Sequence, residues 1–278
     1  MTLIIISGIM MGTLYGMVSI GLSLVYGTLK LFNFSHGSLM TIGAYIAWTS
    51  YQKFDNIWLC VILTLFIMFI FGIILERLII EPFLDRKNIS LIAVITTLAG
   101  IIFLDNSVNI IWGPRLKQLP QLIYGSFVIS YQEIFIIVLA PVLLIMLGLF
   151  LKYHKIGCAI RAVEQNREFS LLVGIRVNQI YRLTFALAAL FAAMAGIMMG
   201  TIRFITPMMG TGYLVKALII VILGGMGSMY GTLVSAYILG IVEAFSMYYF
   251  GLYWTPSIVF LLLIMILIIK PEGIFGRK

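Results

Sequence analysis

Residues 57–75 read IWLCVILTLFIMFIFGIIL, a run of 19 residues without a charged side chain. About 20 such residues, wound as an α-helix, cross the roughly 30 Å hydrocarbon core of a bilayer. Further apolar runs of this kind cover residues 3–26, 38–50, 89–111, 127–151, 182–204, 213–227, 229–250 and 254–269. The sequence therefore predicts an all-α fold, a polytopic bundle of transmembrane helices.

The composition of the whole chain agrees with lipid as the main solvent. Hydrophobic residues make up 62% of the 278 residues and charged residues 10%, and the mean hydropathy is +1.14. A soluble domain carries about 25% charged residues. The runs at 38–50 and 213–227 are short for a full crossing, so we predict eight to nine crossings. We expect one transmembrane domain over residues 1–278, with the first run retained as its first helix.

The basic residues predict the orientation of the bundle. With nine crossings, one side receives five of the 18 Lys and Arg, and the remaining 13 fall on the other side. Cytoplasmic loops are enriched in basic residues. We therefore expect an N-terminus outside and a C-terminus in the cytoplasm. Spread over short loops, this charge argues against nucleic-acid binding. The five residues on the outer side are Lys53, Arg115, Lys117, Arg203 and Lys216.

The longest connection, about residues 152–181, falls on the cytoplasmic side. Its part from residue 159 to 173 has good helix formers without Pro or Gly, and Gly174 is a natural stop. The pattern predicts a short amphipathic helix outside the bilayer. It can rest on the membrane surface or dock a cytoplasmic partner. Three charged residues share one face by their spacing: Arg161, Glu164 and Glu168.

A few polar residues fall inside the apolar runs. A carboxylate at the bilayer centre costs about 3 kcal/mol, so it usually faces a pathway or pairs with another group. These residues either border a translocation path or only hold the bundle together. The candidates for the path are Ser19, Ser23, Asp105, Asn109 and Glu243.

Two polar or glycine-rich stretches interrupt the apolar pattern and are candidate helix breaks or gates. The first, residues 33–37, holds cap and turn formers, and its His36 is expected to be hydrogen-bonded locally. A lone His with no Cys or His nearby predicts no metal site. The second, residues 224–231, lacks the Lys-Ser/Thr of a nucleotide loop and predicts a tight reversal or an unwound segment. The candidate residues are Asn33, His36, Gly37, Gly224, Gly225 and Gly227.

Small residues recur every four positions in two of the runs. Such stripes let two helices approach closely and predict a compact bundle. The stripes are Gly8, Gly12 and Gly16, and Ala188, Ala192, Gly196 and Gly200.

Several segments together resemble the branched-chain amino-acid permease family of ABC importers, in the first of its two permease types. Their order and spacing cover nearly the whole chain. The segments are GLSLVYG at 21–27, NFSHG at 33–37 with GAY at 43–45, RAVEQN at 161–166 leading to Gly174-Ile175, GGMGS at 224–228 and KPEGIFG at 270–276.

The resemblance implies that residues 158–175 form the coupling element that docks on an ATPase. Phe169-Ser170 stands where the family tends to have two small alanines. The positions carried over for the coupling role are Arg161, Ala162, Glu164, Asn166 and Gly174.

The family also implies a location in the cytoplasmic (inner) membrane of a bacterium or archaeon, and it implies partners: a homologous second permease, two cytoplasmic ATPases and an extracytoplasmic binding protein. The expected function is import of Leu, Ile or Val by alternating access. The chain has no Walker motif, so we expect no bound cofactor and no enzymatic activity of its own. Two alternatives remain open: an ABC permease for urea, short amides or another small zwitterion, and a stand-alone secondary transporter or channel.

Overall fold

The computed structural model describes residues 1–84, 86, 88–123, 125 and 130–276. Over these residues the chain is mostly helical, and Lys117 and Ile205 form an isolated β-bridge. This confirms the all-α prediction. In chain order the elements are α1 (Thr2–Leu29), α2 (His36–Phe54), α3 (Ile57–Ile79), the 3-10 turn η1 (Glu81–Phe83), α4 (Ile89–Trp112), α5 (Tyr131–Tyr153), α6 (Lys155–Gln165), α7 (Arg167–Leu172), α8 (Val177–Ile202), α9 (Met209–Gly224) and α10 (Met229–Ile269).

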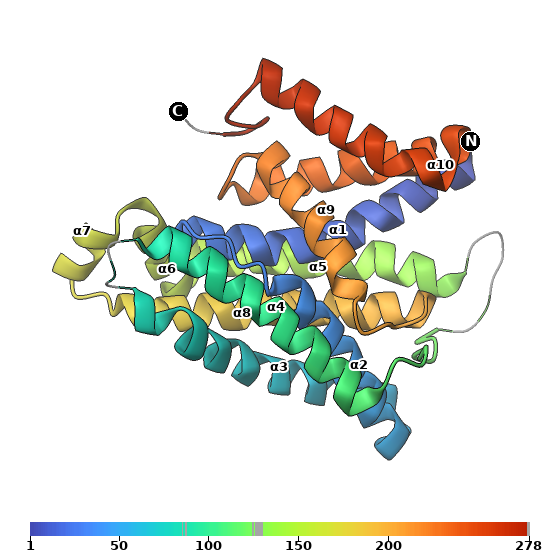
Figure 1. Ribbon diagram of the computed structural model, residues 1–278, viewed down its shortest axis with the longest axis horizontal. Coiled ribbons are helices and arrows are strands. Elements are labelled where there is room, and N and C mark those ends of the chain that lie inside the picture. The colour runs from blue at the N-terminus through green and yellow to red at the C-terminus, as the bar shows by residue number, and fades with distance from the viewer. Residues whose placement is uncertain (85, 87, 124, 126–129, 277–278) are drawn as a thin grey trace.

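Six helices of the described chain are long and apolar enough to cross a membrane: α1, α3, α4, α5, α8 and α10. The 41-residue α10 holds a kink at Gly251, where φ is 80° and ψ is 170°. Its two halves correspond to the separate runs 229–250 and 254–269, and Figure 1 shows the second half turning back beside the first. The two short runs form α2, of 19 residues, and α9, of 16. The predicted runs are therefore helical where the structure describes them, with shifted ends.

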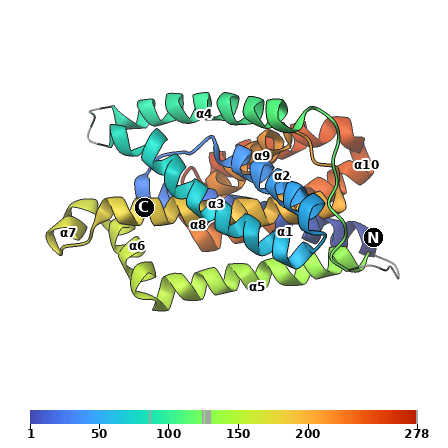
Figure 2. The ribbon, with the colours of Figure 1, turned by 90° about the horizontal axis from the view of Figure 1, so that it is seen from below.

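Helices α1 and α8 form the centre of the bundle. In their most apolar stretches 61% of α1 and 78% of α8 are buried, against 22% of α3 and 28% of both α4 and α5. Helix α1 packs against α8, α9 and α10, and α8 also packs against α2 and α3. In Figure 2, α4 and α5 lie on opposite flanks with α8 between them. The outer helices expose large apolar side chains, as a lipid-facing surface requires.

The two small-residue stripes lie at close helix contacts, as predicted. A Cβ built on Gly12 would lie 2.9 Å from the Cα of Tyr237 in α10, and one on Gly8 would lie 2.9 Å from the Cα of Ile241. A Cβ on Gly196 of α8 would collide with the carbonyl of Met40 in α2. Backbones this close leave room for hydrogen only, so glycine at these positions determines how α1 and α8 are packed.

The two ends of the bundle differ. The N-terminus lies at one end, and the C-terminal segment lies toward the other end, where α6 and α7 project beyond the long helices (Figures 1 and 2). The connection that holds α6 and α7 is therefore on the same side of the bundle as the C-terminus, as the predicted topology requires.

Candidate functional site

The predicted coupling helix is two helices, which corrects the expectation of one helix over residues 159–173. Helix α6 ends at Gln165, and Asn166 adopts an extended conformation with φ −157° and ψ 114°. The Asn166 side chain then accepts a hydrogen bond from the Phe169 amide, 3.0 Å away, and caps α7. Asparagine is a strong N-cap residue, and here this preference prevails over helix continuation. The connection itself is residues 154–176, shorter than the predicted 152–181, because α5 and α8 extend into it.

Helices α6 and α7 together form a helical hairpin, which is stabilised by the turn at Gly174 and by a hydrogen bond from Arg161. Gly174 has φ 87°, and its amide donates to the Leu171 carbonyl at 3.0 Å. This left-handed conformation suits glycine, which confirms the predicted stop. Arg161 donates from Nη2 to the Lys152 carbonyl at 3.0 Å and so ties α6 to the end of α5. Ala162, the fifth residue carried over for coupling, is half-buried on α6.

Glu164 of α6 lies against two glycines from other parts of the chain. A Cβ built on Gly27 of α1 would lie 2.9 Å from Oε1 of Glu164. A Cβ on Gly227, in the turn after α9, would lie 3.6 Å from the same oxygen and 3.3 Å from the Cα of Gly27. The Glu164 carboxylate therefore occupies a notch between α1 and this turn. Sequence analysis missed the notch, although both glycines stand in segments that carry the family resemblance.

The glycine-rich stretch after α9 is a tight reversal, one of the two predicted alternatives. Gly225 and Gly227 have φ values of 94° and 88°, and the Ser228 hydroxyl accepts from the Gly231 amide at 3.1 Å to cap α10. The C-terminal segment packs beside this turn, since the Ile274 amide donates a hydrogen bond to the Leu223 carbonyl at 2.7 Å. The turn, the C-terminal segment and the Glu164 notch thus meet at one end of the bundle.

The tip of the hairpin carries large apolar side chains that face outward. Leu172 and Val173 are 81% and 80% exposed, and Phe169 and Leu171 are exposed beside them. In both ribbon views α7 stands clear of the bundle (Figures 1 and 2). Exposed apolar groups at a projecting tip are typical of a surface that binds another protein. The amphipathic pattern of the sequence predicted an apolar face on this segment, and the structure shows that apolar side chains are exposed at its projecting tip.

The first predicted helix break lies between α1 and α2. The Asn33 side chain accepts from the Ser35 amide at 3.1 Å, within the turn. His36 is fully buried, and its Nε2 donates to the Val18 carbonyl of α1 at 2.9 Å, so the expectation of a local partner is wrong. Gly37 packs against the backbone of Gly210 in α9. The break therefore joins three helices, and its role as a gate stays a prediction.

The polar residues predicted for the path divide into separate places. Asp105 accepts from the Ser38 hydroxyl at 2.7 Å and from the Thr211 hydroxyl at 3.2 Å, and so connects α4 with α2 and α9. Asn109 lies on the exposed side of α4 and does not join this cluster. Asn109 follows Asp105 by four residues, which is about one turn plus 40° and a rise of about 6 Å, and this offset places it outside the contact with α2 and α9.

The two serines of the first run are fully buried. Ser23 accepts a hydrogen bond from the Thr232 hydroxyl of α10 at 3.1 Å, and the Ser19 hydroxyl has no hydrogen-bond partner among the described residues. Both therefore lie inside the helix contacts of this conformation.

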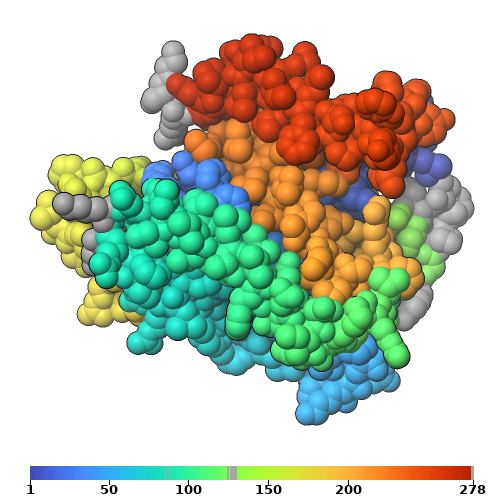
Figure 3. Space-filling model, viewed as in Figure 1, coloured from blue at the N-terminus to red at the C-terminus, as the bar shows by residue number. Residues whose placement is uncertain are grey.

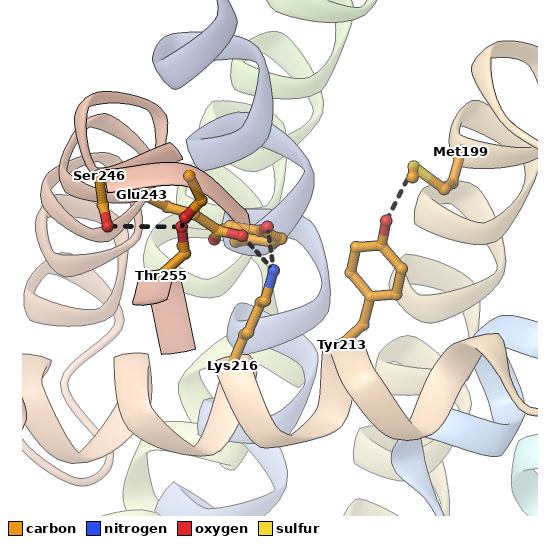
Figure 4. A network of polar contacts seen from close by, with 8 residues as sticks. Met199, Tyr213, Lys216, Glu243, Ser246 and Thr255 are labelled. Carbon is orange, nitrogen blue, oxygen red and sulfur yellow. Dashed lines mark hydrogen bonds and ion pairs between the residues drawn. The ribbon is translucent and has the colours of Figure 1, made fainter. Parts of the chain in front are cut away.

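Glu243 pairs with a residue that the sequence did not connect to it. Lys216 donates from Nζ to Oε1 of Glu243 at 2.5 Å and to the Tyr15 hydroxyl at 2.7 Å (Figure 4). The assignment of Lys216 to an outer connection is wrong, because it lies inside α9. Beside it, the Tyr213 hydroxyl donates to the sulfur of Met199 at 3.2 Å. In the sequence, the only signal for this pairing was that Lys216 lies inside the apolar run 213–227, close to its start.

The sequence matches a family of transport proteins and several of its members. Residues 4–269 match the family described as branched-chain amino acid transport system / permease component. The permease LivH of Escherichia coli (strain K12) is 32% identical over 98% of this chain and 94% of its own length. BraD of Pseudomonas aeruginosa is 32% identical over 98% and 95%. A probable LivH of Methanocaldococcus jannaschii is 28% identical over 99% and 92%.

A solved structure supports the fold alone. PsaBC from Streptococcus pneumoniae, in complex with Fab, superposes with a TM-score of 0.51 at 12% sequence identity, covering 98% of this chain and 92% of that one. The match with the family extends over nearly the whole chain and includes α6, α7, the glycine-rich turn and all of α10. This chain therefore belongs to the branched-chain amino acid transport permease family, whose members are multi-pass membrane transport components and not enzymes.

Proposed function

We propose that this chain is one of the two membrane-spanning subunits of an ABC-type importer that moves Leu, Ile and Val into the cytoplasm. A second homologous permease completes the path, two cytoplasmic ATPases drive it, and an extracytoplasmic binding protein delivers the solute. The relatives LivH and BraD, named as high-affinity branched-chain amino acid permeases, support the substrate class. The chain itself binds no cofactor.

The observation that carries the proposal is the projecting hairpin with an apolar tip. Phe169, Leu172 and Val173 are exposed to water at the end of the bundle that carries α6, α7 and the C-terminal segment. An apolar tip of this kind is stabilised by a partner that covers it. An ATPase on the cytoplasmic side fits, because basic residues are concentrated in the connections at this end.

The Glu164 notch supports transmission of force from the hairpin to the helices. Glu164 contacts α1 through Gly27 and the α9–α10 turn through Gly227. A displacement of α6 therefore acts on two places of the bundle at once. In alternating access, the ATPases close when they bind ATP, the hairpin moves with them, and the cavity changes its opening from the outside to the inside.

The orientation follows from the same end-to-end asymmetry. We place the hairpin and the C-terminus in the cytoplasm and the N-terminus outside the inner membrane. Lys152, Lys155, Arg161, Arg167 and Arg176 flank or belong to the hairpin, and a cytoplasmic position for them satisfies the positive-inside rule.

Reconstitution tests the proposal. The chain is purified with the proposed ATPases, second permease and binding protein, and uptake of radiolabelled leucine into proteoliposomes is measured. We expect uptake only with ATP inside the cytoplasmic compartment, and none by the chain alone under an ion gradient. Gradient-driven uptake by the chain alone would show a secondary transporter instead. Binding of urea or a short amide, and not of leucine, by the partner binding protein would move the substrate to the alternative class.

Two variants test the coupling role of the hairpin. Arg161→Glu removes the hydrogen bond to the end of α5, and Gly174→Pro forces φ from 87° toward about −65°. Both are expected to lose stimulation of ATP hydrolysis by the loaded binding protein while the chain still inserts in the membrane. Lys53→Glu, at the opposite end of the bundle, is the matched charge control. Normal stimulation in both hairpin variants would remove the coupling role.

A further inference from the structure

Lys216 and Glu243 place opposite charges inside the membrane part of the bundle. Lys216 lies in α9 and Glu243 in the first half of α10, and Nζ and Oε1 are 2.5 Å apart. Charged side chains at this depth are costly, and they pair with each other or serve a pathway. A buried pair of this kind is favourable for the fold only when further hydrogen bonds satisfy the remaining polar atoms of both side chains.

The observed pair is neither enclosed nor satisfied. The Lys216 side chain is 32% exposed in this chain, on a helix that forms the surface between α4 and α10 in Figure 3. The Glu243 side chain is 9% exposed, yet its second oxygen, Oε2, is buried and accepts no hydrogen bond from the described residues. The site thus combines an accessible ammonium donor with a buried carboxylate oxygen that lacks a donor.

From this arrangement we infer that Lys216 and Glu243 bind the zwitterionic head group of an α-amino acid during its passage. The inference rests on the proposed function and names the residues that hold the solute. The solute ammonium donates to Glu243, and its carboxylate accepts from Lys216 Nζ and the Tyr15 hydroxyl. Every charge stays paired in this exchange, because the ion pair between Lys216 and Glu243 is replaced by two ion pairs with the solute, one to its carboxylate and one to its ammonium.

The surroundings of the pair suit an aliphatic side chain. The Lys216 ammonium lies 4.8 Å from the centroid of the Tyr15 ring, and the centroid of the Tyr213 ring lies 5.9 Å from that of Tyr15. These groups provide apolar surface directly beside the charged pair. A branched aliphatic amino acid presents the same combination, with a charged end and an apolar end a few bonds apart.

The internal pair also explains how such a site releases its solute. When the zwitterion leaves, Lys216 and Glu243 close on each other again, so no unpaired charge remains in the membrane. Competition from this internal partner keeps the site weak, as a transport pathway requires. Urea and simple amides carry no charges, so they cannot replace the partners of either side chain, and the site selects against them.

Photolabelling of the assembled membrane complex tests the site. The permeases and ATPases in lipid nanodiscs, without the binding protein, are irradiated with a diazirine analogue of leucine, and the labelled peptides are identified by mass spectrometry. We expect labelling on α9 and the first half of α10. Excess leucine should suppress it, and 4-methylpentanoate or isopentylamine, which each keep one of the two charges, should not. Equal suppression by either single-charge analogue would overturn the inference.

Variants separate a binding role from a structural one. Glu243→Gln and Lys216→Met should each lower the labelling about tenfold, since a hydrogen bond to a charged group is lost. Glu133→Gln, a carboxyl change in the first turn of α5, should not. The double variant Lys216→Met/Glu243→Gln removes both charges together, and a pair with only a structural role predicts normal labelling and uptake in it.

The outcomes are distinct from those of the proposed function. Normal leucine uptake by the double variant would overturn the site and leave the importer proposal intact. If the wild-type assembly imports no leucine with ATP, the importer proposal fails and the site fails with it. Uptake by the wild type, with labelling lost in both single variants and in the double variant, supports both.

Discussion

A bulky residue at Gly27 should uncouple the hairpin from the membrane helices. A Cβ at this position would lie 2.9 Å from Oε1 and 3.2 Å from Cδ of Glu164, while ordinary contacts lie at 3.4–4 Å. The first methyl of Gly27→Ala therefore requires the Glu164 carboxylate to retreat by about 0.5 Å, which a flexible side chain can do. The isobutyl group of Gly27→Leu fills the notch and expels the carboxylate from it.

The structure also sets the expected magnitude. Overpacking of a close contact costs about 1–3 kcal/mol, which corresponds to a factor of about 5 to 150 in the population of the seated arrangement. Gly27→Leu should therefore lower leucine uptake per ATP hydrolysed at least fivefold, and Gly27→Ala less than threefold. The same measurement on Gly148→Leu is the control, because a Cβ at Gly148 of α5 meets nothing within 4 Å.

A double variant makes the reasoning specific to the notch. If Gly27→Leu acts by expelling Glu164, then Glu164→Ala should reproduce part of the defect, and the combination should be no worse than Gly27→Leu alone. Uptake and ATP hydrolysis are measured in the same proteoliposomes. Wild-type coupling in Gly27→Leu, or an equal defect in Gly148→Leu, would refute the notch as a link between the hairpin and the bundle.

Three further predictions concern stability and orientation. Gly12→Ala places a methyl group 2.9 Å from the backbone of α10 and should lower the free energy of unfolding in detergent by about 1–3 kcal/mol, whereas Gly148→Ala should not lower it; equal thermal midpoints would contradict the close packing of α1 and α10. Arg182→Met removes the cation that donates to Glu81 at 2.5 Å and whose Nε lies 3.8 Å from the fully buried Glu76 carboxylate, so it should lower the thermal midpoint; adding Glu76→Gln should restore part of the loss, because Glu81 is partly exposed and keeps its hydration, and an unchanged midpoint in Arg182→Met would contradict this pairing. The exposed native thiol of Cys158 should react with a membrane-impermeant maleimide only after cells are permeabilised, and labelling of intact cells would reverse the proposed orientation.

The broad fold could be predicted from the sequence because the choice between lipid and water is made locally. A run such as residues 57–75 is apolar in any context, and in a bilayer a helix satisfies the hydrogen bonds of its backbone within the run itself. The Gly8–Gly12–Gly16 spacing and the stop at Gly174 are equally local signals, and both hold in the structure. Asn166 was a local signal for the division between α6 and α7, but a continuous helix and a helix capped by asparagine differ by little in free energy, so the sequence did not predict the division.

The sites depend on contacts that no local pattern contains. Lys216 meets Glu243 across 27 residues and Tyr15 across 201 residues, and the Glu164 notch combines glycines from α1 and from the turn after α9. By itself the sequence determined an all-helical membrane protein with a helical connection outside the bilayer, because partition into lipid is a sum over neighbouring residues. Only the tertiary structure decided which charges pair and where the hairpin touches the bundle, because these depend on the crossing of helices that are distant along the chain.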